Sequence, residues 1–470
     1  MTTPHHAFTR RVVEAALTID PPDADTSALG ALLGDGIGVL VAGLQHPNIA
    51  LLLEHAGAMG SRQVQIPTKR VRTTTPDAAF VCGAAIHAMD FEPMFDPPTH
   101  ALSPVLGALV PLLVASGPAQ TGDARRWRAA FAVGLQLQAD LRCAAREADA
   151  EAARLGRHFP FQRSGFHPPG TVGVLGAALA SARWLGLDVD QTCTALGIAG
   201  SRAGALSANI GTMTKATHCG QAARAGVESA LLAARGVTAC TSILEAPGGW
   251  GEIFGGEGFD LKRLVDGMHR LDCVREPGFA FKRWPAHTAM QVAIHTALPL
   301  YRPEYIPGQV TVSTPVLPYC DRPDPRDPDE ARFSFQACVA LALHDGRVDT
   351  RSFTPESLER ASLRSLLSRV RLVRDPTRAT AFPALTLRIE LDDGRSAEGD
   401  RWPGHWKSPA TPDQLHEKFA ACTRPALGAA RSHALNAAVW DAARGDTLEP
   451  LRHELTHQGA RQRRPRHASA

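Results

Sequence analysis

The sequence predicts a mainly helical protein with a smaller α+β domain, and three observations support this two-domain architecture. The chain has 470 residues, which is more than one hydrophobic core usually organises. Apolar residues recur with helical spacing through the first half, whereas strand-forming residues gather only after about residue 266. Helical spacing then returns near the C-terminus. The expected parts are a helical domain at 1–265, an α+β domain at 266–405, a helical return at 411–456 and a basic, disordered tail at 457–470.

The first domain is predicted from four apolar segments that are bounded by glycine or proline. The segment ALSPVLGALVPLLVAS is shorter than the roughly 20 residues that a membrane span needs, and two prolines interrupt it. We therefore expect a buried helix there and no membrane partner. The helices expected in chain order are at 26–44, 101–116, 124–147 and 170–187.

The second domain is predicted from short runs of β-forming residues that alternate with helical segments. The last run, ALTLRIELDDG, ends in a turn-forming Asp-Asp-Gly. Strands are few and do not alternate regularly with helices, so a doubly wound sheet fits poorly. The expected strands are at 309–317, 369–375 and 384–394, with helices at 331–346 and 355–370 and two more in the C-terminal return.

Composition limits the partners and the compartment of the protein. The formal net charge is +3, so nothing indicates a nucleic-acid partner, and the basic segment RQRRPRHASA is interpreted as a frayed tail. No N-terminal stretch has the pattern of a secretion signal. The nine cysteines form no CxxC pair, which is typical of reduced thiols in the cytoplasm and argues against structural zinc.

The stretch HAMDFEPMFDPPTH, residues 87–100, combines two histidines and three acids with three prolines. Prolines prevent it from forming one continuous helix. On the residues alone, a metal site, an acid–base site and a solvated loop all remain open.

Three further segments place polar groups at breaks beside apolar helices. His167 precedes a Pro-Pro-Gly-Thr run, where a helix N-terminus could meet a carboxylate or be an ordinary helix start. Lys215 and His218 lie at the start of a helix of small residues. Lys215 could bind a substrate carboxylate there or be an ordinary solvated lysine. The segment FKRWPAH contains Lys282, Arg283 and His287. A single histidine on a helix is more often structural than catalytic, so His287 alone is a weak indication. Irregular backbone of this kind can line a pocket, so together the four segments indicate a site.

These segments together resemble the MmgE/PrpD family. The matching pieces are GAAIHAMDF, GFHPPGTVGVLGAALASARWLGLD, GQAARAGVESALLAARG after Lys215, KRWPAH, YCDRP, EARFSFQ and HDG, in the family's order over nearly the whole chain. The resemblance implies a large helical domain made from both chain ends and a smaller α+β domain. It also implies a homodimer with the active site between domains, and neither a metal nor another cofactor. Of the three alternatives for residues 87–100, the resemblance favours acid–base or substrate-orienting groups over a metal site or a solvated loop.

The resemblance also assigns residues by position. Asp90 falls on the family's acidic position and Lys215 on its lysine, and YCDRP places Tyr319 at an active-site tyrosine. The histidines that match are His100, His167 and His287. Where many members read Asp-Phe-Asp-Asp-Thr, this chain reads Asp-Phe-Glu-Pro-Met. Met94 therefore replaces a pocket threonine and Ala101 a proline, which puts the substrate in doubt.

The leading hypothesis is a cofactor-independent lyase, a dehydratase or decarboxylase, acting on a methylcitrate- or aconitate-type di- or tricarboxylate. Negative charge develops on a carboxylate in such reactions, so cations must meet it. We expect Lys215, Lys282 and Arg283 to hold carboxylates beside Met94. His100 and Asp90 are expected to act on the reacting carbon, with Tyr319 as an acid. An epimerase or isomerase of a substituted succinate such as iminodisuccinate, and an inactive scaffold relative, are the alternatives.

Overall fold

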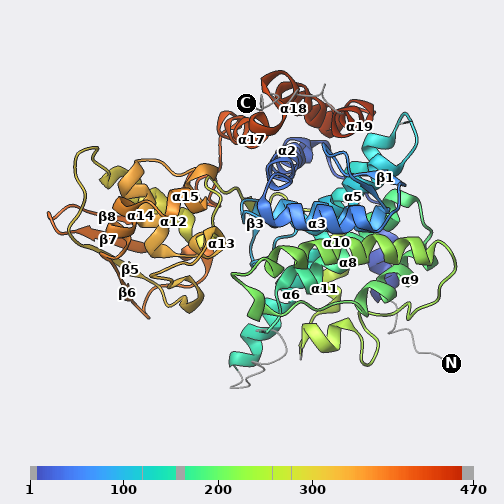
Figure 1. Cartoon of the computed structure of the whole chain (residues 1–470). Coiled ribbons are helices and arrows are strands. Elements are labelled where there is room, and N and C mark those ends of the chain that lie inside the picture. Colours follow the sequence, from blue (N-terminus) through green and yellow to red (C-terminus); the bar gives the residue numbers. More distant parts are fainter. Residues whose placement is uncertain (1–7, 119, 155–164, 257, 277, 458–470) are drawn as a thin grey trace, which may run out of the picture.

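The computed structural model describes all residues except 1–7, 119, 155–164, 257, 277 and 458–470, so the predicted basic tail lies outside the described part. The chain forms a large helical body and a smaller body that contains a four-stranded sheet (Figure 1). The predicted fold class is confirmed. Two separate hydrophobic cores correspond to the two bodies.

The helical body is built around helices whose surfaces are buried almost all round. Helix α5 occupies the apolar segment that we expected to be buried, and Leu102 to Leu113 are all buried within it. The helices of this body, in chain order, are α1 (Phe8–Thr18), α2 (Thr26–Gly43), α3 (Pro47–Ala58), α4 (Thr75–His87), α5 (Leu102–Ala115), α6 (Asp123–Arg154), α8 (Pro168–Leu185), α9 (Val189–Gly200), α10 (Thr214–Ala233) and α11 (Leu261–Arg270).

Glycines allow α4, α5 and α10 to approach so closely that backbone meets backbone. A Cβ on Gly220 of α10 would lie 2.3 Å from the Phe80 carbonyl oxygen, and a Cβ on Gly107 of α5 would lie 2.6 Å from the Gly83 Cα. Any larger side chain would therefore separate the helices. This contact brings the C-terminal end of α4 beside the N-terminal end of α10, which is where His87 and Lys215 lie.

Helix α2 is the one helix in the described ranges that is long and apolar enough to cross a membrane. However, 72% of its apolar window is buried inside the protein. It packs against α4 and against two helices of the C-terminal return, α17 (Pro412–Leu427) and α18 (Ala429–Arg444). Its apolar composition is therefore explained by its place in the core.

The smaller body contains a mixed sheet with strand order β6-β5-β7-β8. Its strands are β5 (Val310–Thr314), β6 (Val370–Arg374), β7 (Leu387–Leu391) and β8 (Ser396–Gly399). Strand β5 is parallel to β6 and antiparallel to β7, and β8 forms a hairpin with β7. The sequence predicted the first three strands but not β8, whose short Ser-Ala-Glu-Gly segment lacks β-branched residues.

Helices cover this sheet, and one predicted helix is divided. Helices α12 (Thr288–Ala297) and α14 (Phe335–Asp345) pack against the strands. The other helices of this body are α13 (Pro328–Ala331), α15 (Pro355–Leu358) and α16 (Ala361–Leu367). The single helix expected at 355–370 was wrong, because the chain breaks between α15 and α16 and residue 370 already belongs to β6. The segment expected at 331–346 also starts with a turn, between α13 and α14.

The chain passes between the two bodies at two places. Strand β3 (Met94–Phe95) pairs with β4 (Phe279–Ala280), and α11 before β4 still packs in the first core. The boundary predicted after residue 265 therefore falls inside α11. After β8, helices α17, α18 and α19 (Glu449–Thr456) lie over α2 at the top of Figure 1.

Candidate active site

The predicted site residues of both bodies meet at the junction between them. The helical body supplies the loop after α4, the start of α5, the residue before α8 and the first turn of α10. The second body supplies the segment between β4 and α12. The side chains that gather there and are at most 7% exposed are His87, Asp90, Glu92, His100, His167, Lys215, His218, Lys282, His287 and Arg332.

Asp90 lies between two lysines. Lys215 Nζ is 2.7 Å from Asp90 Oδ2, and Lys282 Nζ donates to Asp90 Oδ1 and, at 2.7 Å, to the Asp90 carbonyl oxygen. Burial raises the pKa of Asp90, but the nearby ammonium groups of Lys215 and then Lys282 outweigh it and hold this pKa well below its usual range. Asp90 is therefore an ionised anchor for two cations rather than a ready proton acceptor.

The backbone at Asp90 adopts a left-handed conformation, with φ of 49°. This conformation is strained for a residue other than glycine, so a protein keeps it only where the surrounding contacts hold the backbone in place. The carbonyl contact from Lys282 is one such constraint. The strained turn aims the carboxylate into the junction between the two bodies.

Glu92 accepts bonds from several neighbours in the same pocket. His87 Nδ1 bonds to Glu92 Oε1, Ser103 Oγ donates to it at 3.0 Å, and His100 Nδ1 is 2.9 Å away, although not in hydrogen-bond geometry. Burial raises the pKa of Glu92, but His87 and His100 reverse this and hold it well below its usual value. Glu92 is therefore an anion that orients two imidazoles.

These contacts define the protonation of both rings. Lys215 Nζ lies 2.6 Å from His87 Nε2, and because an ammonium can only donate, His87 accepts there and carries its proton on Nδ1. Burial, followed by the electrostatic effect of the neighbouring His87, lowers the pKa of His100 to about 3, so His100 is a neutral imidazole at neutral pH. With Glu92 beside its Nδ1, the Nε2 lone pair is left to act as a base.

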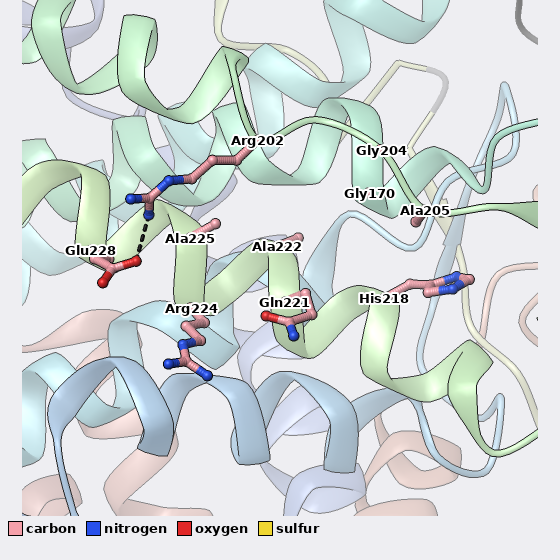
Figure 2. A pocket seen from close by; sticks show the side chains of 10 residues that line it. All are labelled: Gly170, Arg202, Gly204, Ala205, His218, Gln221, Ala222, Arg224, Ala225 and Glu228. Carbon is pink, nitrogen blue, oxygen red and sulfur yellow. Dashed lines mark hydrogen bonds and ion pairs between the residues drawn. The ribbon is translucent and has the colours of Figure 1, made fainter. Parts of the chain in front are cut away.

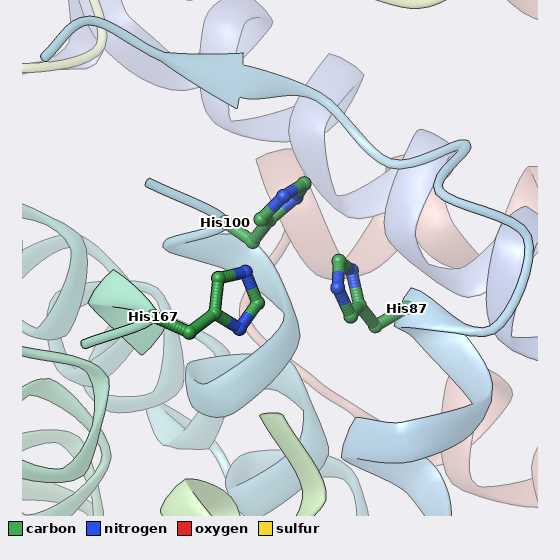
Figure 3. Close-up of side chains that lie close together, drawn as sticks. All are labelled: His87, His100 and His167. Atoms are coloured by element: carbon green, nitrogen blue, oxygen red, sulfur yellow. The ribbon is translucent and has the colours of Figure 1, made fainter. Parts of the chain in front are cut away.

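Two more histidines continue the cluster toward the surface. His167 Nδ1 and His218 Nδ1 are 3.1 Å apart, and the His167 ring lies 5.6 Å from the His87 ring and 5.7 Å from the His100 ring, between centroids. Figure 3 shows His87, His100 and His167 gathered around one point. Burial lowers the pKa of His167 well below its usual value and that of His218 to about 4. His100, His167 and His218 are therefore neutral imidazoles in one cluster.

His218 also lines a cavity of about 400 Å³ along the outer face of α10 (Figure 2). The two arginines of this cavity are already ion-paired. Arg202 Nη1 is 2.5 Å from Glu228 Oε2, and Arg224 Nη1 is 3.3 Å from Asp77 Oδ1. The cavity is consequently close to electrically neutral.

The second body closes the opposite side of the site. The His287 ring is 5.5 Å from the Tyr319 ring and 5.2 Å from the Phe333 ring, and Lys215 Nζ lies 5.2 Å from the Phe333 ring centroid. Burial lowers the pKa of His287 to about 3. His287 also caps α12 by accepting from the Ala289 N–H, so it has a structural as well as a lining role.

Arg332 is the residue of this wall that the sequence reasoning did not single out. Its side chain is buried, its Nη1 is 3.3 Å from Asp329 Oδ1, and its Nε lacks a partner among the described residues. Arg332 lines a space of about 20 Å³ together with Asp90, Lys215 and Phe333. A buried guanidinium with spare donors is suited to a carboxylate.

Two groups in the described part of the chain could hold a metal ion by ligand spacing alone: His87 with His100 and His167, and Asp90 with Glu92 and His100. Both nitrogens of His87 are already bonded, to Glu92 and Lys215. An incoming cation would also meet the two ammonium groups on Asp90. The donor set therefore fits an anion better than a metal ion.

Two predicted substrate-binding residues lie elsewhere. Arg283 pairs with Glu417 of α17 at 3.1 Å, although its neighbour Lys282 reaches Asp90. Met94 is buried in the core of the second body, on β3. The replacement of threonine by Met94 thus adds apolar packing at the junction, and a pocket-lining role for either residue stays a prediction.

The residues that sequence reasoning missed were within its reach. His87 and Glu92 belong to the stretch at residues 87–100, and Arg332 is inside EARFSFQ. His218 was named beside Lys215 but was not assigned to the site. A carboxylate and a histidine five residues apart across a proline-rich loop were the available signal for the first pair. Their pairing depends on the fold of that loop, which spacing does not determine.

Comparisons with known proteins cover most of the chain. The MmgE/PrpD N-terminal domain matches residues 8–262, and the MmgE/PrpD C-terminal domain matches residues 284–442. The cis-aconitate decarboxylase of Mus musculus is 34% identical over 360 residues, covering 73% of this chain and 71% of that protein. The cis-aconitate decarboxylase of Homo sapiens is 34% identical over 368 residues, covering 75% and 73%. The matched C-terminal domain includes α17 and α18, which pack on the helical body.

Proposed function

The chain is an enzyme of the MmgE/PrpD family, and from that premise we propose that it is a lyase that decarboxylates or dehydrates a tricarboxylate of the aconitate type. The observation that carries the proposal is the buried pocket in which a neutral His100 lies beside the Lys215–Asp90–Lys282 cluster. The similarity to two cis-aconitate decarboxylases favours decarboxylation.

Binding of the substrate would depend on the cations of the pocket. Asp90 carries one negative charge and contacts two ammonium groups, so the cluster has one positive charge to spare. Lys215 and Arg332 both line the small space at its centre. We assign to them the carboxylates of the substrate, because these charges would be worth most in a site from which water is excluded.

Proton transfer would use different groups in the two reactions. In dehydration, His100 Nε2 takes the proton beside a carboxylate, and Tyr319 or Lys215 protonates the departing hydroxyl. In decarboxylation, the electrons of the broken carbon–carbon bond pass into the unsaturated acid, which is then protonated, so each carbon dioxide released consumes one proton. Asp90 is reserved for holding the lysines, because both of its carboxylate oxygens are bonded to their ammonium groups. All these groups are side chains of the protein, which is why we propose a mechanism without a cofactor.

Entry of the substrate requires the site to open. The space beside Lys215 is about 20 Å³, whereas pockets for small molecules usually measure about 300–1,000 Å³. Lys282 and His287 lie on the second body and Asp90 and Lys215 on the first. We propose that the two bodies separate to admit the substrate and that closure rebuilds the Asp90 cluster around it.

The proposal is tested by incubating the purified chain with cis-aconitate and with 2-methylcitrate, and by following carbon dioxide release and the absorbance of the unsaturated acid. Carbon dioxide released from cis-aconitate supports the decarboxylase, and a new unsaturated acid formed from 2-methylcitrate supports the dehydratase. A change in optical rotation with iminodisuccinate alone would replace the lyase by an epimerase. No reaction with any of the three would overturn the proposal.

The role of His100 has its own test. His100→Ala should lower kcat by a factor of about 100 to 10,000, because one positioned proton-transfer group typically contributes that much. His433→Ala is the matched control, since His433 is exposed on α18. Full turnover by His100→Ala would remove His100 from the mechanism while leaving the reaction assignment intact.

A further inference from the structure

The side chains of the adjacent residues Lys282 and Arg283 lie in two different sites. Lys282 belongs to the Lys215–Asp90–Lys282 cluster, called the catalytic cluster below because the proposed reaction takes place beside it. Arg283 lines a separate cavity between the second body and α17. Neither Asp90 nor His100 is among the residues that line this cavity. The proposed reaction therefore leaves Arg283 without a function.

The cavity has the dimensions and the walls of a small-molecule site. Its volume is about 480 Å³, within the range of about 300–1,000 Å³ that ligand pockets occupy. Apolar wall comes from Phe91, Trp284, Leu298 and Val348. Such walls suit an organic skeleton better than a bare inorganic ion.

The charges in the cavity favour an anion. Three cations line it, Arg283, Arg347 and Lys418, against the two acids Asp349 and Glu417. Asp349 is already held by Arg351, with Oδ2 2.6 Å from Nη2. Arg347 is exposed and forms no hydrogen bond or ion pair within the described ranges. Its charge acts on Asp349, but its guanidinium donors are not engaged by any described residue and are available for a carboxylate at the edge of the apolar cavity.

The cavity is connected to the catalytic cluster through the backbone. Lys418 Nζ donates to the Phe91 carbonyl oxygen at 2.8 Å, and its ammonium lies 4.0 Å from the Phe91 ring centroid. Phe91 directly follows Asp90, and Arg283 directly follows Lys282. Two walls of the cavity are therefore one peptide bond from the Asp90–Lys282 ion pair.

We propose that this cavity is a second binding site, for a small organic molecule with two or more carboxylates, and that its occupation is coupled to the catalytic cluster. A ligand held by Arg283 and Arg347 on one side and Lys418 on the other joins the second body to α17. It therefore favours the closed arrangement in which Lys282 reaches Asp90. Binding at either site then strengthens binding at the other by the same factor.

The cavity of about 400 Å³ beside His218 does not share these properties. Its arginines, Arg202 and Arg224, already have carboxylate partners in Glu228 and Asp77. An anion there would have to displace an acid of the protein. At α17, Arg283 and Lys418 are also paired, with Glu417 and Asp35. Arg347, however, forms no hydrogen bond or ion pair in the described ranges, so it offers an anion a cation without such competition.

The experiment is equilibrium calorimetry of the full chain with tricarballylate, a saturated tricarboxylate that lacks the double bond and hydroxyl on which the proposed reactions depend. We expect two equivalents bound per chain. Arg347→Gln should weaken one of them by about tenfold or more, since one charge-assisted hydrogen bond contributes roughly that factor. Lys215→Met should remove the other. Arg371→Gln, an exposed arginine on β6, is the matched control and should change neither.

The outcomes separate this inference from the proposed function. A single equivalent that survives Arg347→Gln and disappears in Lys215→Met would overturn the second site and leave the catalytic site standing. A single equivalent with the opposite response supports the second site and counts against the proposed function. Inorganic phosphate that competes as well as tricarballylate for the Arg347-dependent equivalent would overturn the assignment to carboxylates.

Discussion

Asp90 and Asp35 are both buried carboxylates bonded to lysines that are distant in the sequence, yet their surroundings shift their pKa values in opposite directions. Asp90 is 3% exposed and contacts two ammonium groups. Asp35 is 6% exposed, contacts only Lys418 at 2.6 Å, and its Oδ1 has no partner among the described residues. Burial raises the pKa of Asp35 to about 6 despite Lys418, whereas the pKa of Asp90 stays well below normal. The ammonium of Lys282 is the contact that Asp90 has in addition to a first lysine and that Asp35 lacks.

That second ammonium comes from the other body of the molecule. Lys215 belongs to the helical body and is fixed by the packing of α10 on α4, but Lys282 arrives with the second body. The charge of the catalytic cluster is therefore complete only when the two bodies are together. Asp35 and Lys418 both lie within the helical body and its return helix, so their pairing does not depend on this closure.

The largest expected effect comes from making Asp90 resemble Asp35. Lys282→Met leaves Asp90 with one ammonium, so its pKa should rise and an acidic limb should appear in the pH profile of kcat/KM. Breaking a buried pair by removal of one partner costs about 3–5 kcal/mol, and loss of one preorganised cation should lower kcat by about a hundredfold or more. Urea unfolding and steady-state kinetics measure the two effects.

Lys262→Met is the control for this variant, because Lys262 is exposed on α11. It should leave both stability and kcat/KM near those of the wild type. A Lys282→Met protein that unfolds normally and keeps its full kcat/KM would show that Lys215 alone maintains Asp90, and the comparison with Asp35 would fail.

The sequence predicted the fold class and most of this cluster for identifiable reasons. Proline- and glycine-marked breaks beside apolar helices identified Lys215, Lys282 and His167, because such breaks are where polar groups can face a pocket. Asp90 and His287 were also present in the segments singled out from the residues, and the family resemblance assigned both to the site. The direction of a side chain could not be predicted in the same way, since adjacent residues such as Lys282 and Arg283 diverge according to a local backbone that only the packed structure defines.

The second expected effect is on the Asp35 side of the comparison. Lys418→Met removes the only cation of Asp35 and the donor to the Phe91 carbonyl oxygen. We expect a loss of about 3 kcal/mol, at the lower end for a broken buried pair, because Asp35 can become neutral by taking up a proton. Chemical unfolding of Lys418→Met and of the double variant Asp35→Asn/Lys418→Met measures it. The double variant should recover part of the loss, and no recovery would mean that the cost lies in the Phe91 contact instead.

The pH dependence of stability should show the third effect. The folded pKa of Asp35, about 6, is above its ordinary value of 3.8, so between these values the folded state binds more protons than the unfolded state. Asp35 therefore stabilises the fold at low pH and loses this contribution as the pH rises through about 6. The difference in unfolding free energy between the wild type and Asp35→Asn should fall by about 1–2 kcal/mol from about pH 4.5 to about pH 6. A difference that rises over this range would give Asp35 the behaviour of Asp90.

Acid should nevertheless destabilise the whole protein, because the buried histidines act with the opposite sign. The folded pKa is about 3 for His100 and His287 and about 4 for His218, below the ordinary value of 6.5. The unfolded chain therefore takes up protons below about pH 6.5 that the folded chain refuses, and stability is lost on acidification. This is why the contribution of Asp35 is visible only as a difference between two proteins measured at the same pH.

The smallest expected effect is on activity and uses the matched variants Asp35→Asn and Asp90→Asn. An amide at position 35 can still accept from Lys418, which keeps its bond to Phe91, so kcat/KM should change by less than about threefold. An amide at position 90 leaves two buried ammonium groups without a counter-charge, which favours loss of a proton or displacement of a lysine, and kcat/KM should fall by about a hundredfold or more. Parallel steady-state kinetics at neutral pH provide the comparison. Equal losses in the two variants would mean that any buried acid near the Asp90–Phe91 turn has the same effect on activity. The number of ammonium groups would then not be what distinguishes Asp90 from Asp35.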